Sequence, residues 1–544
     1  MTGNNGLTKH IFFNGLLALL FLGTLNSAKA QEGYNIIWIT VEDLSPRIGA
    51  YGDELAKTPN IDQLAKEGVR YTNAYTTYGV CAPNRHTLIT GMYPTSTGAM
   101  AMRTWKRTSA LDKITDPELL NIPVYEATPP AGVKCFSEYF RAAGYYCTNN
   151  SKEDYQFKTP ITAWDESGSD AHWRNRPDKD MPFFAVFNSM ATHESQIFKA
   201  YYPKITDPLH VVVPPYYPDT PTVRADIARY YDNVHAMDRW VGELIGQLKE
   251  DGLYDKTIIL FFTDHGDGLP RAKRWVYDSG IKVPLIIRYP NGKGKGTTED
   301  KLVSFVDFAP TTMGLAKLKI PEYMEGYDFL DNKIKEREYV YAFRDRMDPA
   351  PETIRAVRND RYKYIRNYRP DLPYIGFIPY RDKARIMQEI LQLKEAKRLG
   401  PDQWQFWSEK KPLEELYDIR NDPYEINNLA SNPQYFEKLA TLRTAQEEFG
   451  KNYGDLGMMP ESELIKRLWP PDGKQPQVEK PSVNRTPKGL VLETATARAS
   501  IAYRYDKGNW KLYTAPLKKT RNKKIEVIAC SIGWKPSLIT TKKL

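Results

Sequence analysis

Three short motifs in this chain carry side chains that can do chemistry. Cys81 begins a C-x-P-x-R motif that ends at Arg85 and continues as T-L-I-T-G. Two further pairs, Glu42-Asp43 and Asp264-His265, each follow an apolar run. Carboxylate oxygens are the ligands that a hard divalent cation such as calcium prefers, and a cysteine side chain is a candidate for covalent catalysis. The alternatives are a buried structural cysteine before a helix and acids that cap turns at strand ends.

The elements around these motifs predict a doubly wound α/β fold. Residues 34–41 and 257–263 are almost continuously apolar, which is typical of central parallel strands. Further strands are expected at 69–75, from 144, at 182–188 and at 283–288, and helices at 58–67, 136–143, 223–251 and 304–315. Alternating strands and helices build a mostly parallel sheet, and ligands bind such sheets at the carboxyl ends of the strands. Cys81 and both acidic pairs map to that edge.

Residues 1–30 are predicted to be a secretory signal peptide. Lys9 and His10 precede an apolar run at 11–22, and residues 28–30 have the small-x-small pattern of a cleavage site. The run is shorter than the roughly 18 apolar residues that a membrane-spanning helix needs, and no later segment reaches that length. We therefore expect a periplasmic or secreted protein without a membrane span.

The length of the chain calls for two or three domains. We expect a catalytic α/β domain at 31–340, a small α+β subdomain at 341–465, a linker at 466–487 and a small β-rich domain at 488–544. The last domain could bind carbohydrate or brace the enzyme, and we favour bracing. Four cysteines are too few for a disulfide scaffold. Cys135 and Cys147 could pair, or Cys147 could lie in a buried strand.

The C-x-P-x-R motif, followed by T-L-x-T-G, is similar to the signature of the type I sulfatases of the alkaline phosphatase superfamily. The resemblance implies that Cys81 is oxidised to formylglycine (3-oxoalanine) by a formylglycine-generating or sulfatase-maturating enzyme. The aldehyde hydrates to a geminal diol. One of its oxygens attacks sulfur, and the second then expels sulfate as the aldehyde re-forms, which is covalent catalysis with its own release step.

The resemblance extends over residues 34–465. Residues 415–429 match the family pattern E-L-Y-D-x-x-x-D-P-x-E-x-x-N-L. That pattern implies an alkaline phosphatase-like sheet joined to a small C-terminal α+β subdomain, here with a β-sandwich appended. The E-D pair, the T-H-E-S loop around His193 and the N-S-K stretch around Lys152 look closest to the heparan N-sulfatase-like branch.

The same resemblance implies one calcium ion held by Glu42, Asp43, Asp264 and His265 beside Cys81. Glu42 departs from the aspartate pair that the family usually has, although its longer side chain can still reach. His265 would add a nitrogen ligand, which is unusual for calcium and leaves room for another divalent ion.

Cations and one histidine complete the expected site. Arg85 would anchor the diol, Lys152 matches a family lysine, and Lys273 would lie near the leaving oxygen, where positive charge stabilises the transition state. Asp154 stands where the family has a histidine that holds the diol. His193 would donate to the leaving group or to sulfate. The alternatives are lysines with solvated loop charges and a loop histidine without a role.

Other polar residues carry weaker signals. Arg103 follows the signature helix, in a region that faces substrate in the related sulfatases. Three remaining histidines match no family position and are expected to be structural: His172, His210 and His235.

The predicted function is hydrolysis of sulfate esters on a sulfated polysaccharide or its oligosaccharides, such as ulvan or a glycosaminoglycan. The formal net charge of +9 fits a polyanionic partner, although a solvated lysine-rich tail would also account for it. Export argues against nucleic acid. The alternatives are a phosphoester or phosphonate hydrolase of the same superfamily, and a catalytically silent protein that binds sulfated glycans.

Overall fold

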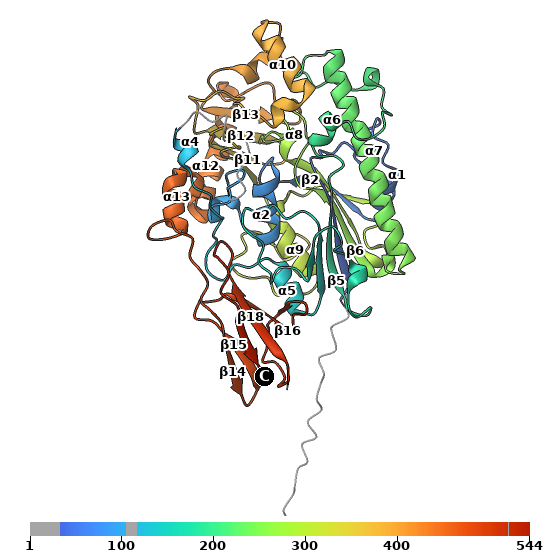
Figure 1. Cartoon of the computed structure of the whole chain (residues 1–544). Helices are drawn as coiled ribbons and strands as arrows, with labels where there is room; N and C mark the ends of the chain where they lie inside the picture. The colour runs from blue at the N-terminus through green and yellow to red at the C-terminus, as the bar shows by residue number, and fades with distance from the viewer. Residues whose placement is uncertain (1–32, 105–116, 521) are drawn as a thin grey trace, which may run out of the picture.

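The computed structural model describes residues 33–104, 117–520 and 522–544, so the predicted signal peptide lies outside it. Its largest part is a nine-stranded sheet with helices on both faces, as the sequence predicts (Figure 1). All strand pairs are parallel except the two that β7 makes with β6 and β2. In spatial order the strands are β4 (Glu166–Ser167), β3 (Tyr146–Asn150), β5 (Phe183–Ser189), β1 (Asn35–Val41), β6 (Thr257–Thr263), β7 (Lys282–Arg288), β2 (Val69–Tyr75) and β8 (Thr297–Glu299), with β9 (Val303–Ser304) also on β2.

Strand β1 contributes to two apolar cores because its side chains alternate between the faces of the sheet. Ile37 and Ile39 pack with one set of helices, and Ile36 and Trp38 pack with the other. The first set is α1 (Pro59–Glu67) and α7 (Pro221–Glu250), and the second is α2 (Cys81–Thr90), α5 (Ser137–Ala142) and α9 (Phe308–Leu315). Burial on both faces explains why β1 reads as a continuous apolar run.

A second, antiparallel sheet forms the predicted C-terminal subdomain. Its four strands are β10 (Val340–Arg344), β11 (Ile354–Arg358), β12 (Tyr362–Asn367) and β13 (Glu414–Asp418), in that order. Helix α12 (Phe436–Tyr453) packs on this sheet. Helix α10 (Arg385–Glu395), inserted between β12 and β13, packs against α7.

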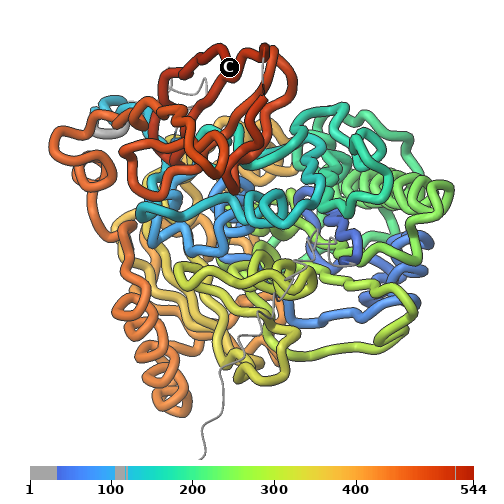
Figure 2. The backbone as a smooth tube through the Cα atoms, turned by 90° about the horizontal axis from the view of Figure 1, so that it is seen from below, coloured from blue at the N-terminus to red at the C-terminus, as the bar shows by residue number. Residues whose placement is uncertain are grey.

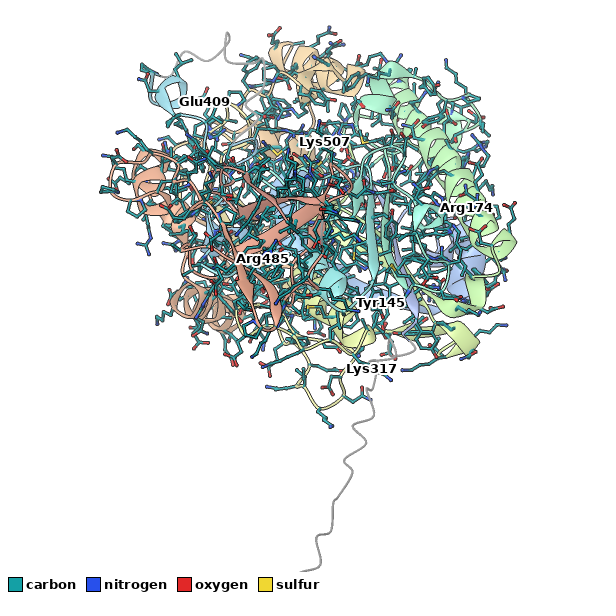
Figure 3. All side chains as sticks on the ribbon, turned by 60° about the horizontal axis from the view of Figure 1, so that its bottom comes forward. Tyr145, Arg174, Lys317, Glu409, Arg485 and Lys507 are labelled. Carbon is teal, nitrogen blue, oxygen red and sulfur yellow. The ribbon has the colours of Figure 1, made fainter. Side chains whose placement is uncertain are left out.

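Two small antiparallel sheets follow at the C-terminus. One contains β14 (Ser482–Thr486) and β15 (Gly489–Glu493), and the other contains β17 (Lys511–Leu512), β16 (Ser500–Tyr505), β18 (Lys524–Cys530) and β19 (Thr540–Lys543). Val483 and Leu492 of the first sheet share an apolar core with Ile501 and Val527 of the second, as expected of a sandwich. Figure 3 labels Arg485 and Lys507 on this unit.

The segment 466–487 differs from the linker expected there. It contains the end of α13 (Glu461–Leu468) and the whole of β14. Its many prolines and lysines are typical of a linker, but β14 forms a hairpin with β15, in which Thr486 lies opposite Gly489.

The sandwich packs directly on the catalytic domain, as Figure 2 shows from below. Trp469 donates from Nε1 to Thr128 Oγ1 at 2.9 Å and to the Gly533 carbonyl at 3.1 Å. Ile532 belongs to the apolar core that contains α5 and α9. These contacts agree with a bracing role.

The four cysteines are free and buried, so Cys135 and Cys147 do not pair. Cys147 lies in β3, and its thiol instead donates to the carbonyl oxygens of Ser137 and Tyr145, both at 3.7 Å. Among the described residues, no helix has the length and apolar character needed to span a bilayer.

Candidate active site

The strands β3, β5, β1 and β6 are neighbours and run parallel, so their carboxyl ends meet at one edge of the sheet. Val41 is in register with Ser189 on one side and with Thr263 on the other. Glu42-Asp43 and Asp264-His265 therefore leave the sheet side by side. Lys152 follows β3 and His193 follows β5, which brings both to the same edge.

Cys81 is the first residue of α2, where unpaired backbone N–H groups and the helix dipole favour negative charge. Gly79, two residues before the helix, packs against the Trp275 carbonyl. A Cβ at position 79 would collide with that carbonyl, so only glycine fits there. Asn84 donates to the backbone carbonyl of Asp264 and thereby ties the helix to the end of β6. The thiol is buried, and the alternative of an isolated structural cysteine does not fit its polar surroundings.

Acidic and nitrogen ligands surround the thiol. The potential ligand atoms of Asp43, Cys81, Asp264 and His265 all lie within 4.8 Å of one another, and a second group joins Glu42 and His193 to Asp43 and Cys81. His265 Nε2 is 3.3 Å from Cys81 Sγ, 3.1 Å from Asp43 Oδ1 and 3.6 Å from Asp264 Oδ1. Buried, closely spaced carboxylates fit a hard divalent cation. Glu42, Asp43 and Asp264 would supply its oxygen ligands.

The electrostatics keep these carboxylates ionised. Burial would raise the pKa of Asp43, but Lys273 and His265 outweigh it and hold that pKa well below its usual value. Burial opposes ionisation of Asp264 too, yet His265 and Arg85 lower its pKa to about 2. Burial would lower the pKa of His265, whereas Asp264 and Asp43 raise it well above the usual value. The carboxylates are therefore ionised and able to bind a cation, and His265 would have to release its proton to join them as a ligand.

The predicted cations converge on the acids. Arg85 reaches Glu42 Oε1 at 3.1 Å and Asp264 Oδ2 at 3.3 Å. Lys152 binds Glu42 Oε2 at 2.6 Å, and Lys273 donates to both oxygens of Asp43, at 2.7 and 2.9 Å. The side chains of Lys152 and Lys273 are only 17% and 3% exposed, so these are not solvated loop charges.

His193 lies at the same edge with its ring fixed. Its Nδ1 is 2.9 Å from Ser195 Oγ, and its Nε2 is 3.9 Å from Glu42 Oε2. Burial and the neighbouring Lys273 lower the pKa of His193, although Asp43 and Glu42 act in the opposite sense. The geometry leaves Nε2 directed into the site.

Three site residues escaped the sequence prediction. Glu194 pairs with Arg274 through two bonds of 2.6 and 2.9 Å, and its backbone N–H donates to Asp43 Oδ2 at 2.8 Å. Asn188 Oδ1 accepts from Arg85 at 2.8 Å. Glu194 and Arg274 directly follow the predicted residues His193 and Lys273, and Asn188 is the next-to-last residue of β5. These positions in the sequence are the signal that could have revealed them.

The structure also places the residues of the two weaker predictions, Arg103 and the three remaining histidines. Arg103 donates to Asp154 Oδ1 at 2.6 Å, so the aspartate at the position of the family histidine holds an arginine instead. His172 bonds Gln247 at 3.0 Å, while His210 pairs with Asp207 on the surface. Like His235, which lies on α7, they hold no hydrogen bond or ion pair to the site residues that the structure describes.

Comparison with protein families decides the relationship. The model of the family described as Sulfatase matches residues 34–318, more than half of the chain. The chain belongs to the sulfatase family. This hydrolase also matches the model of the N-sulphoglucosamine sulphohydrolase C-terminal region over residues 271–399, which agrees with the branch that the sequence suggested.

Curated relatives of this sulfatase cover most of its length. It is 43% identical to an ulvan-active sulfatase of Formosa agariphila over 552 aligned positions, which cover 94% of this chain and 91% of that one. Human N-sulphoglucosamine sulphohydrolase is 24% identical and covers 75% of this chain and 88% of its own.

Solved structures share the sulfatase's fold. A protein in complex with its substrate D-glucosamine-2-N,6-O-disulfate superimposes with a TM-score of 0.56 at 18% identity and covers 79% of this chain and 100% of that one. The phosphonate monoester hydrolase of Agrobacterium radiobacter gives a TM-score of 0.55 at 16% identity, with coverages of 85% and 99%. Both support the alkaline phosphatase-like architecture.

Proposed function

We propose that this sulfatase hydrolyses sulfate esters on a sulfated polysaccharide or its oligosaccharides, with ulvan as the leading candidate. One observation carries the proposal. The Cys81 sulfur lies within 4.8 Å of carboxylate oxygens from two neighbouring strand ends and of a His265 nitrogen. The 43% identity to an ulvan-active sulfatase supports the substrate class, and the basic net charge suits a polyanion.

The catalytic group is proposed to be formylglycine, made from Cys81 by a maturation enzyme. A formylglycine diol at this position supplies an oxygen nucleophile for sulfur and a second oxygen that expels sulfate. A calcium ion held by Glu42, Asp43, Asp264 and His265 would supply Lewis-acid stabilisation of the sulfate charge.

The chain's own residues divide the remaining work. Arg85 lies about one helical turn after Cys81 on α2. Two carboxylates and Asn188 fix its guanidinium, and we assign it to orient the side chain at position 81. Lys152 and Lys273 provide fixed positive charge for the sulfate oxygens and the leaving oxygen. His193 holds Nε2 towards the site and is the candidate donor of a proton to the leaving sugar oxygen.

Two alternative functions predict different experimental results. A phosphoester or phosphonate hydrolase would fit the structural likeness to a phosphonate monoester hydrolase, but that likeness concerns the fold. A silent glycan-binding protein would keep Cys81 as a thiol. Rates on an aryl sulfate and the matching aryl phosphate separate the first alternative, and tandem mass spectrometry of the peptide that contains Cys81 separates the second.

The decisive experiment is a desulfation screen of the protein purified from a host that makes formylglycine. Ulvan oligosaccharides and glycosaminoglycan fragments of defined sulfation are the substrates, and released sulfate is measured. Sulfate release from ulvan oligosaccharides supports the proposal. An unmodified thiol at position 81 in protein from the native host would sink the catalytic mechanism.

Export to the periplasm or the medium is part of the proposal. It rests on the charged, apolar and small-x-small pattern of residues 1–30. Fractionation of the native host, with sequencing of the mature N-terminus, tests it: cleavage after Ala30 is the expected result.

A further inference from the structure

A tight turn that carries Asp348 is bonded to the segment before Arg103: the Met102 N–H donates to the Arg346 carbonyl at 2.8 Å, and Arg346 donates to the Met102 carbonyl at 3.3 Å. Met347 and Ala350 exchange two backbone hydrogen bonds of 2.9 Å across the turn. Arg346 donates to the Asp348 carbonyl at 2.7 Å and binds Glu461 at 2.5 and 2.9 Å. The carboxylate of Asp348 is therefore carried on a rigid support.

Strained backbone occurs here as well as elsewhere in the chain. Asp348, Arg103, Asp154 and Arg274 have φ angles of +51°, +59°, +55° and +77°. Side chains other than glycine rarely adopt this left-handed region. Such strain persists only where the surrounding structure enforces it, and it is concentrated at functional sites.

Asp348 shares its electrostatic environment with the catalytic centre. Burial raises the pKa of Asp348, while Arg274 and Arg103 act in the opposite sense. Arg274 is the residue that pairs with Glu194 in the site. Burial alone would lower the pKa of Arg103. The charges of Asp154, Cys81 and Asp348 outweigh burial, so the pKa of Arg103 is raised. The contact that fixes Arg103 is its ion pair with Asp154, two residues after Lys152.

Two carboxylate oxygens in this region lack a donor. Oδ1 of Asp348 and Oδ2 of Asp154 are buried and accept no hydrogen bond from any described residue. The other oxygen of Asp154 accepts from Arg103, whose side chain is 29% exposed. Buried carboxylate oxygens without partners are costly, and their donors must come from water or from a ligand.

We propose that Asp348, together with the Arg103–Asp154 pair, forms the subsite for the sugar ring that carries the scissile sulfate. Asp348 accepts a hydrogen bond from a free hydroxyl next to the sulfate ester. The inference deepens the proposed function and rests on it.

Charge then makes Asp348 a specificity residue. Arg85, Lys152 and Lys273 provide the positive charge around Cys81, whereas Asp348 faces the ring as an anion. A second sulfate or a carboxylate at the neighbouring ring position would meet like charge, and partner discrimination of this kind depends on repulsion as much as on attraction. The enzyme should therefore prefer rings with one sulfate and a free adjacent hydroxyl.

Wild type, Asp348→Asn and Asp348→Ala are compared on three substrates. These are a monosulfated oligosaccharide, the same oligosaccharide with a second sulfate on the adjacent hydroxyl, and an aryl sulfate without hydroxyl groups. Asp360→Asn is the matched control, because the Asp360 side chain is exposed and, within the described parts of the chain, is bound by Arg420 alone. Melting temperatures show whether each variant is folded, and the near-isosteric Asp348→Asn serves if Asp348→Ala is not.

The kcat/KM ratio of monosulfated glycan to aryl sulfate is expected to fall about 10- to 100-fold in Asp348→Ala, since a hydrogen bond to a charged group is lost. In Asp348→Asn the preference for the monosulfated over the disulfated ring should fall about tenfold. If wild type hydrolyses these substrates and both ratios stay within about twofold, the inference is overturned but the proposed function stands. Wild type without sulfatase activity overturns both.

Discussion

The Sγ atom of Cys81 lies 3.3 Å from Nε2 of His265, although the two residues come from a helix N-terminus and a strand end. The contact joins the candidate nucleophile to the acidic cluster, because the same nitrogen is 3.1 Å from Asp43. Both partners are buried. A modified side chain at position 81 would therefore lie among the charged side chains that would stabilise the reacting sulfate.

Replacement of Cys81 tests the nucleophile. Cys81→Ala removes the only source of the proposed diol, so turnover should fall at least about 10³-fold. Released sulfate and the melting temperature are measured together. Cys530→Ala, in β18 and also buried, is the control and should keep its turnover. Turnover of Cys81→Ala near that of wild type would contradict the assignment.

Removal of divalent cations tests the acidic cluster. EDTA would strip the proposed cation from the carboxylates of Glu42, Asp43 and Asp264, so activity and melting temperature should both fall. Calcium at about 100 times its Kd should restore about 2.7 kcal/mol of stability. Differential scanning calorimetry measures the shift.

A variant makes the metal test specific. Asp264→Asn removes one ligand charge and should abolish most of the calcium-dependent shift. Asp255→Asn is its control, because Asp255 is 86% exposed and pairs with Arg288 away from the cluster. An equal shift in both variants would argue against a cation held by Asp264.

The burial of His86 predicts that the protein loses stability as the pH falls. Its ring contacts the Tyr155 carbonyl at 3.0 Å and Thr97 Oγ1 at 2.8 Å, and burial lowers its pKa to about 4. Between about pH 6.5 and pH 4 the unfolded chain binds a proton that the native state does not. The contribution of His86 is complete above that window and declines by about 3 kcal/mol as the pH falls through it.

Urea unfolding of wild type and His86→Gln at both ends of the window measures this contribution. The variant does not titrate at this position, so its stability should fall less with decreasing pH than that of wild type. The same pH dependence in both proteins would exclude His86 as the cause.

Gly533 tests how the sandwich is attached. Its φ is +76°, and an added Cβ would collide with the Thr128 side chain and lie 2.6 Å from the Ala127 carbonyl. Gly533→Ala should cost about 1–3 kcal/mol of stability and leave kcat/KM unchanged, as expected of a sandwich that only braces the fold. Gly450→Ala is the control: that helical position has no atom within 4 Å of the new Cβ, so stability should rise by up to about 1 kcal/mol. An unchanged melting temperature in Gly533→Ala would contradict the attachment.

Much of the site could be predicted from the sequence because it is encoded locally. Apolar runs fix where β1 and β6 end, and the residues that follow them must leave the sheet together when the strands are parallel neighbours. Cys81 and Arg85 are one helical turn apart, so one short motif places both.

The chain by itself therefore determined the fold class, the strand-end acids and the C-x-P-x-R helix. The tertiary structure alone decided that Glu194 pairs with Arg274, that Asp154 holds Arg103, and that Arg346 bonds the Met102 carbonyl next to that arginine. Strand and helix periodicity acts over a few neighbouring residues, whereas these pairs join loops that are far apart in sequence. Such loops meet only when the packing of both sheets fixes the position and direction of each.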